Sequence, residues 1–414
     1  MEINQNNILP YLSKKTGLLK EGEPVTVTEL NYETDHYAEG YINFIYRVKQ
    51  GAKSFIVKQA RPYLRVPAIA DSLPISRNYL EYISFHMRKE IVKNYVPEVY
   101  FVDAENGIFV MEDLSRNMKI LRFELCRGQF FHFFAEQIGE FLAKIHFYTS
   151  ELYLSKQVFC DLHKSFINVD MRSIMEDIVL LKNDIELECQ ECGALKQIAE
   201  DIWENPKTRL EMMLIRDVFK KKAECLIHGD LHPSNIFVDD RKIRVIDMEY
   251  SFIGPFGYDL GYLLANFISQ FSAFSFNTQF TVSEREGFQR YLLDTLVSVF
   301  DVYFRILREC FEQDARDAYK MTAGYLERLF IDILHDALGF MSSANMSRII
   351  NMGGFPDFDC IPDANLQLLA KGLSLTIDEF FLLNRKAVIS PAMIKKILLC
   401  IQREYLIMRG KVLL

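Results

Sequence analysis

The chain has 414 residues, enough for one large two-lobed domain or two ordinary domains with a substantial core. Half of the residues are apolar and a quarter are charged, which is typical of a globular protein and excludes a disordered chain or a small disulfide-stapled module. The formal net charge of −8 excludes a generally basic surface, so we expect neither nucleic acid nor a membrane as a partner.

The cysteines and the N-terminus predict a cytoplasmic protein. Eight cysteines in this length are too sparse for a disulfide scaffold, and the single CxxC pair, Cys189 and Cys192, has no second pair to complete a zinc site. The N-terminus lacks the basic and apolar segments of a signal peptide, and no window of about 18 residues is apolar throughout.

The first quarter of the chain shows the short apolar runs and polar turns of an antiparallel sheet. One helix interrupts these runs, because Leu80, Ile83, Met87 and Ile91 recur at helical spacing within residues 76–93. The expected strands are 44–48, 54–58, 99–102 and 108–111.

Beyond Leu114 the sequence predicts mainly helices. The clearest is 129–148, where apolar residues from Phe130 to Ile145 recur at spacings of three and four. A strand-rich island follows at 225–247, with short apolar bursts joined by polar loops. We therefore expect an α+β protein with a bilobal, protein-kinase-like fold. Residues 1–112 would form a small antiparallel-sheet N-lobe that binds nucleotide, and residues 113–414 a large, mainly helical C-lobe for catalysis and substrate binding.

Two polar loops of the island carry residues suited to phosphoryl transfer. The reaction needs a carboxylate beside the nucleophilic hydroxyl and hard oxygen ligands for Mg²⁺ on the nucleotide phosphates. Asp230, in the sequence His-Gly-Asp-Leu-His, suits the first task, and Asp247, in Ile-Asp-Met-Glu, suits the second. Asn235 follows Asp230 by five residues, the offset of the metal-binding amide in kinases. Glu249 would point to the same side as Asp247 if that segment is extended, and it would then be a second carboxylate ligand of the metal.

Each loop alone would more often be a turn or a solvated strand end, and it is their joint occurrence at this spacing that favours a catalytic site. His228 and His232 are expected to orient the first loop through hydrogen bonds.

The N-lobe offers candidates for a nucleotide clamp. Lys58 ends an apolar strand, from which it can reach phosphates, and Glu81 on the following helix can pair with it. Gly40 would let the loop at 39–44 approach a phosphate closely, and Asn43 would donate a hydrogen bond there.

The end of the last N-lobe strand is expected to be the hinge whose backbone contacts adenine. Its residues are Met111, Glu112, Asp113 and Leu114.

At these positions the sequence resembles the aminoglycoside phosphotransferase and choline kinase superfamily, whose signature is an HGDxHxxN loop followed by IDxE or IDxD. Within it, the stretch 246–261, together with segments near 56–65, 111–115, 139–150 and 325–350, is most similar to the 5-methylthioribose kinases. The resemblance implies Mg²⁺-dependent transfer of the ATP γ-phosphoryl group to the 1-hydroxyl of 5-methylthioribose, a step of methionine salvage. Asp230 would orient or deprotonate that hydroxyl.

Two positions depart from the pattern of these kinases. They usually have Ser where this chain has Asn235, and an Arg-Arg pair where it has Ser347 and Arg348. The resemblance implies that Arg348 binds the substrate. Serine has neither the charge nor the fork-shaped donors of the missing arginine.

Two alternatives remain at this stage. The acceptor could be another sugar, a choline- or homoserine-like amino alcohol or an aminoglycoside, or the chain could be a catalytically silent kinase-like binding protein. The tail at 364–414 could pack on its own lobe, which we take as the default, or form a homodimer.

Overall fold

The computed structural model describes residues 1–20, 22–30, 42–64, 72–180, 194–351 and 356–410. The chain divides into two compact units, each built from separate stretches of sequence. Unit 1 comprises Met1–Leu121, Asn168–Ile174 and Ser234–Ser251, and unit 2 comprises Arg122–Ile167, Met175–Pro233 and Phe252–Leu414. The functional lobe boundary at residues 112 and 113 stays a prediction.

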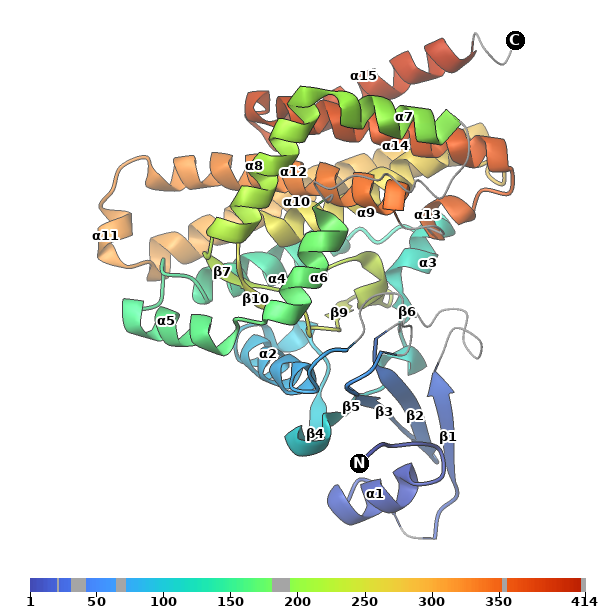
Figure 1. The fold of residues 1–414 in the computed structure, drawn as a ribbon, viewed down its shortest axis with the longest axis vertical. Coiled ribbons are helices and arrows are strands. Elements are labelled where there is room, and N and C mark those ends of the chain that lie inside the picture. Colours follow the sequence, from blue (N-terminus) through green and yellow to red (C-terminus); the bar gives the residue numbers. More distant parts are fainter. Residues whose placement is uncertain (21, 31–41, 65–71, 181–193, 352–355, 411–414) are drawn as a thin grey trace. The chain divides into compact units, whose positions relative to one another are not determined.

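Unit 1 contains an antiparallel sheet in the order β1-β2-β3-β5-β4 (Figure 1). A second small sheet has the order β6-β8-β9. Its elements are α1 (Ile8–Lys15), β1 (Val25–Leu30), β2 (Phe44–Gln50), β3 (Lys53–Gln59), α2 (Arg77–Val92), β4 (Val99–Asp103), β5 (Ile108–Glu112), β6 (Lys119–Ile120), β8 (Ile236–Val238) and β9 (Ile243–Val245).

The β2–β3 hairpin fixes the register at the centre of the larger sheet. Gln50 pairs with Lys53 across a loop of Gly51 and Ala52, and Gly51 has a φ of 56°. A two-residue hairpin loop favours such a left-handed conformation because its twist matches that of the strands. The same register places Lys58 opposite Ile45 on β2 and Phe109 on β5.

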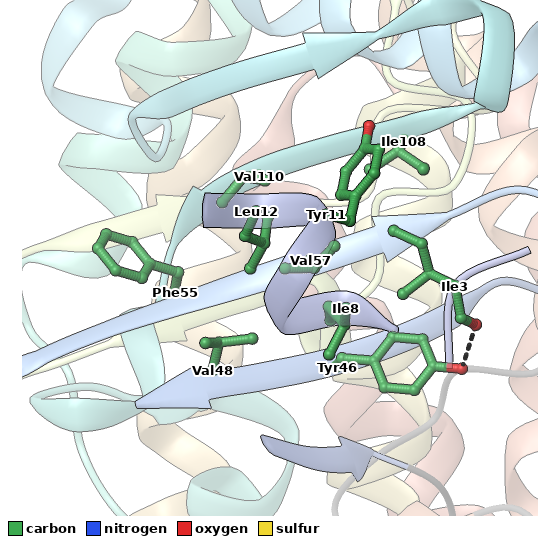
Figure 2. Packing of buried hydrophobic residues seen from close by; sticks show 10 residues of the cluster. All are labelled: Ile3, Ile8, Tyr11, Leu12, Tyr46, Val48, Phe55, Val57, Ile108 and Val110. Atoms are coloured by element: carbon green, nitrogen blue, oxygen red, sulfur yellow. Dashed lines mark hydrogen bonds between the residues drawn. The ribbon is translucent and has the colours of Figure 1, made fainter. Parts of the chain in front are cut away.

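One face of this sheet is covered by α1 and the N-terminal segment, as Figure 2 shows. Ile8 and Leu12 of α1 pack with Val48 and Val57 of the sheet, since alternate residues of a strand face the same side. The hydroxyl of Tyr46 donates to the carbonyl of Ile3 at 2.9 Å. The contact joins the N-terminal segment to β2.

Unit 2 is mainly helical. Its elements include a small β7–β10 sheet and the longest helices of the described chain. They are α3 (Leu121–Cys126), α4 (Phe134–Tyr148), α5 (Lys156–Ser165), α6 (Val169–Val179), α7 (Ala194–Glu204), α8 (Pro206–Lys221), β7 (Cys225–Ile227), β10 (Phe252–Gly254), α9 (Tyr258–Phe276), α10 (Val282–Asp314), α11 (Asp317–Lys320), α12 (Tyr325–Asn351), α13 (Pro356–Asp359), α14 (Ala364–Asn384) and α15 (Pro391–Gly410), with α3 and α6 beginning in unit 1.

Helix α9 forms the centre of unit 2 and is buried along almost its whole length. It packs against α10, α12 and α14. At Gly261 the backbones of α9 and α12 come so close that a Cβ atom would lie 2.3 Å from the carbonyl oxygen of Ala337. A larger residue would force the two helices apart.

The expected fold class is confirmed, with an antiparallel sheet near the N-terminus and a larger helical part. The expected strands and the helix at 76–93 correspond to β2–β5 and α2. The helix expected from residue 129 begins only at Phe134, and Phe130, which lies before it, is 47% exposed. In the island, β7 belongs to unit 2 but β8 and β9 belong to unit 1.

The tail packs within unit 2, as the default expectation had it. Helix α14 contacts α9 and α12, and α15 contacts α10. The CxxC pair lies outside the described residues. None of the helices in the described part of the chain combines the length and the hydropathy that crossing a bilayer requires.

Candidate active site

In unit 1, Lys58 is the centre of a buried cluster of carboxylates. Its ammonium group lies 2.8 Å from the carboxylate of Glu81, contacts Asp247 and lies 3.9 Å from Glu249. The pairing of Lys58 with Glu81, expected from the sequence, is therefore present. Strand β3 positions the lysine and α2 the glutamate, whereas the other two carboxylates come from the loop after β9.

The charges of this cluster hold Lys58 in its protonated form. Burial disfavours the ammonium ion, but Asp247, Glu249 and Glu81 outweigh burial and raise the pKa of Lys58. Burial, with repulsion from the other two carboxylates, raises the pKa of Glu81 to about 8 against the attraction of the lysine. A protonated lysine fixed on a strand is suited to binding phosphate oxygens.

The loop at 247–251 adopts an unusual backbone conformation. Asp247 has a φ of 65°, which is costly for a residue with a Cβ atom and persists only where surrounding contacts enforce it. The Asn168 amide donates to the carbonyls of Glu249 and Ser251 at 2.8 and 3.0 Å, and the Ser251 hydroxyl lies 2.9 Å from that of Ser84 on α2. These contacts hold the loop in place while the Asp247 side chain stays 31% exposed.

The carboxylate of Glu249 is enclosed. Both of its oxygens lie 2.8 Å from the amide nitrogen of Asn43, and one lies 3.4 Å from Nε of Arg77. Arg77 also donates to the Asn43 side-chain oxygen at 3.1 Å, which closes a ring of three side chains. Burial raises the pKa of Glu249, although Lys58 and Arg77 oppose the shift.

The hinge residues extend from the end of β5. The main chain of Glu112 donates to the carbonyl of Glu98 at 2.8 Å, and the Asp113 carboxylate lies 3.2 Å from Nε of Arg47 on β2. The side chains of Met111 and Leu114 are buried. The contact of this segment with adenine stays a prediction, and Gly40 lies outside the described residues.

The oxygen donors of unit 1 fit a magnesium ion through Asp247. Among the described residues, no three His, Cys, Asp or Glu side chains are grouped as a metal cage. Mg²⁺ does not need one, because it commonly takes one or two carboxylates and completes its shell with water and phosphate. Asp247 has the accessible carboxylate, and Asn235, whose main chain accepts from Ile246 at 3.0 Å, offers an amide oxygen.

In unit 2, a buried aspartate holds the loop that carries Asp230. The carboxylate of Asp259, at the start of α9, accepts hydrogen bonds from the main-chain N–H groups of His228 and Gly229 at 2.6 and 3.0 Å. Gly229 has a φ of 89°, a conformation that glycine adopts without strain. The main chain of Asp230 donates to Nδ1 of His228 at 3.2 Å, so His228 orients the loop as expected.

Asp230 is held in its ionised form. Burial alone would raise the pKa of its carboxyl group, but polar neighbours outweigh burial and lower it. These neighbours are His232, Arg348 and Tyr262. A carboxylate with a low pKa is a weak base, so a group of this kind is better suited to orienting a hydroxyl through a hydrogen bond than to removing its proton.

Arg348 lies in the surroundings of Asp230 within unit 2. Its guanidinium donates to the hydroxyl of Tyr262 at 3.0 Å and to the side-chain oxygen of Asn266 at 2.8 Å. The Tyr262 hydroxyl is also hydrogen-bonded to Asp230. One tyrosine thus joins the predicted catalytic carboxylate to the predicted substrate-binding arginine.

Sequence reasoning missed several residues of these two clusters. They are Arg77, Asn168, Asp259, Tyr262 and Asn266. Asp259 lies in the Gly-Tyr-Asp-Leu-Gly run at 257–261, within the stretch 246–261 that carries the resemblance, and this pattern was the available signal. Nothing in the sequence distinguished the other four from ordinary helix or loop residues.

Comparisons with known proteins agree with this chemistry. Residues 134–296 match the phosphotransferase enzyme family. A methylthioribose kinase from Geobacillus sp. (strain WCH70) is 31% identical over 93% of both chains, and one from Bacillus pumilus (strain SAFR-032) is 29% identical over 91% of both. The chain belongs to the methylthioribose kinase family.

Solved structures with similarity to the chain include more distant kinases. A putative aminoglycoside phosphotransferase from Ralstonia eutropha JMP134 has a TM-score of 0.43 and 11% identity, covering 93% of this chain and 99% of its own. Choline kinase from Cryptosporidium parvum Iowa II has a TM-score of 0.39 and 15% identity, covering 84% of this chain and 92% of its own.

Proposed function

We propose that this protein transfers the γ-phosphoryl group of ATP to the 1-hydroxyl of 5-methylthioribose. The observation that carries the proposal is the group of side chains in unit 2 in which an ionised Asp230 is joined to Arg348 through Tyr262. An ionised carboxylate can orient a sugar hydroxyl, and a fork-shaped cation can bind the neighbouring oxygens. The names of the relatives support the same acceptor.

The proposal gives each unit its own task. In unit 1, Lys58 binds phosphate oxygens, the backbone at 111–114 binds adenine, and Asp247 with Asn235 would hold Mg²⁺. The ion, when bound, neutralises charge on the phosphates. Glu249, which the sequence analysis included among the metal ligands, holds Asn43 in place through its buried contacts.

In unit 2, Asp230 accepts a hydrogen bond from the acceptor hydroxyl and takes its proton at a carboxylate oxygen as the bond to phosphorus forms. Because a phosphoryl transition state is loose, proton transfer to Asp230 contributes less to the rate than the positioning of the reacting groups. His228 and Asp259 hold the loop so that Asp230 does not need to reorganise during the reaction.

Arg348 also argues against a cationic acceptor. An amino alcohol or aminoglycoside would bring a positive charge towards a guanidinium, and like charges at close range repel. Methylthioribose is uncharged and offers its ring oxygen and hydroxyl oxygens to the arginine. The arginine therefore favours a neutral sugar over choline-like substrates.

ADP release coupled to NADH oxidation tests the proposal across 5-methylthioribose, ribose, choline, homoserine and an aminoglycoside. We expect saturable turnover with methylthioribose, and none without Mg²⁺. Turnover with choline but not with methylthioribose would reject methylthioribose as the acceptor. No turnover with any acceptor would indicate a catalytically silent binding protein.

The proposal also includes the remaining sequence-based expectations: a cytoplasmic location, ATP and the sugar as partners, and neither nucleic acid nor membrane. A homodimer formed through the tail is tested by light scattering after gel filtration, which separates a mass of 48.4 kDa from twice that value.

A further inference from the structure

Asn266 is the point at which two buried arginines of unit 2 meet. Its side-chain oxygen accepts a hydrogen bond from Arg348 of α12 at 2.8 Å and another from Arg122 of α3 at 3.0 Å. Its amide nitrogen donates to the carbonyl of Tyr262, one turn earlier on α9, at 2.9 Å. Asn266 is 1% exposed, so its side chain has almost no contact with water.

Arg122 is itself fixed. Its guanidinium forms a buried ion pair with Asp357 of α13, and Gln270 of α9 donates to the same carboxylate. A buried arginine whose charge is matched by a buried carboxylate has little freedom to move, because losing the partner would leave a charge uncompensated. Arg122 therefore sets the position of the Asn266 oxygen from one side.

The amide is chemically suited to this place. An amide oxygen has two lone pairs and can accept from two guanidinium groups at once. It carries no net charge, so it orients Arg348 without forming an ion pair with it. Tyr262 and Asn266 are four residues apart on α9, on the same face of the helix, and together they hold two donor nitrogens of Arg348.

We propose that Asn266 is a positioning residue for the acceptor site: braced by the Arg122–Asp357 pair, it holds the guanidinium of Arg348 in the orientation that binds the acceptor sugar beside Asp230. The kinetic part of this inference rests on the proposed function. The inference also assigns a task to Arg122. This arginine lies far from Arg348 in the sequence and supports it through Asn266.

The test compares Asn266→Leu with Gln289→Leu. Leucine is close to asparagine in size and cannot accept a hydrogen bond. Gln289 is a matched control, because it is also a buried amide that bonds to α9, through the carbonyl of Phe271 and the hydroxyl of Ser275. Both variants lose a buried amide of unit 2, but only the first loses contact with Arg348.

We expect Asn266→Leu to raise KM for the acceptor at least tenfold while KM for ATP stays within twofold, and Gln289→Leu to change neither. In an Arg348→Met background, Asn266→Leu should change the acceptor KM by less than twofold, because its effect passes through the arginine. An unchanged acceptor KM in Asn266→Leu, or a full effect without Arg348, overturns the inference.

A crystal structure of the Asn266→Leu variant tests the inference without any substrate. We expect the guanidinium of Arg348 to leave its place or lose its density while the helices stay where they are. An Arg348 that keeps its rotamer and its bond to Tyr262 overturns the inference, whatever the acceptor. Absence of turnover in the unmodified enzyme would instead reject the proposed function, and the crystal structure would still decide the role of Asn266.

Discussion

Replacing Arg77 by methionine gives the most direct measure of what holds the site of unit 1 together. The Arg77 side chain is 0% exposed, and its Nε lies 3.4 Å from the carboxylate of Glu249. It also donates to the Asn43 side-chain oxygen and to the carbonyls of Arg61, Leu73 and Pro74, at 3.0 to 3.2 Å. Methionine fills similar space but donates no hydrogen bond.

The expected cost follows from the charge that is left behind. Removing one partner of a buried ion pair costs about 3–5 kcal/mol. That is a large part of the ~5–15 kcal/mol by which folded domains are usually stable. In the Arg77→Met/Glu249→Gln double variant both charges are absent, so we expect it to lose about 2 kcal/mol less than the sum of the single variants.

Urea unfolding followed by far-ultraviolet circular dichroism measures these free energies. Tryptophan fluorescence is the internal control, because Trp203, the single tryptophan of the chain, lies on α7 in unit 2 and should respond less than unit 1 does. The reasoning is refuted if Arg77→Met costs under about 1 kcal/mol, or if the double variant loses the full sum of the two single costs.

Three further outcomes are expected. Asp230→Asn and Asp247→Ala should each lower kcat by roughly 10²–10⁴-fold with unchanged circular dichroism, and ADP release with most of the activity retained would reject their roles. Burial raises the pKa of Asp378 well above its ordinary value, so in the folded state it keeps its proton where the unfolded chain has lost it. The stability that Asp378 contributes should therefore fall as pH rises above about 4, and Asp378→Asn should remove that loss. In urea titrations the stability of the variant relative to the unmodified protein should then grow with pH, and a constant difference contradicts this. Gly261→Ala should destabilise the protein by about 1–3 kcal/mol, because the added Cβ atom would meet α12. Gly287→Ala is the control: its Cβ atom would have nothing within 4 Å, so thermal melts should show a neutral or stabilising effect. Equal effects of the two substitutions would show that the close approach does not matter.

Local patterns predicted much of the fold because they depend on neighbours in the chain. Alternating apolar residues and a glycine turn produced the β2–β3 hairpin, and apolar residues at three and four produced α2. The helix expected from residue 129 was too long because apolar spacing does not show where a helix begins. Phe130 fits the pattern and is nevertheless exposed.

The motifs of the candidate site were visible for the same reason. Asp230, Asn235, Asp247 and Glu249 lie in two short loops, and the joint occurrence of both loops at this spacing indicated phosphoryl transfer. The pairing of Lys58 with Glu81 could be expected because it joins neighbouring elements. The contacts of each carboxylate could not be predicted. The enclosure of Glu249 by Asn43 and Arg77, for example, was unexpected.

The sequence by itself indicated the class of chemistry, since the charged residues within one short loop stay close to one another wherever that loop lies. Only the tertiary structure decided which partners hold them. Arg77 and Arg122 look like solvated helix residues in the sequence, and both are buried by contacts with residues far along the chain. Asn266 meets Arg122 across 144 positions, and no local pattern encodes such a contact, because it depends on how whole helices pack.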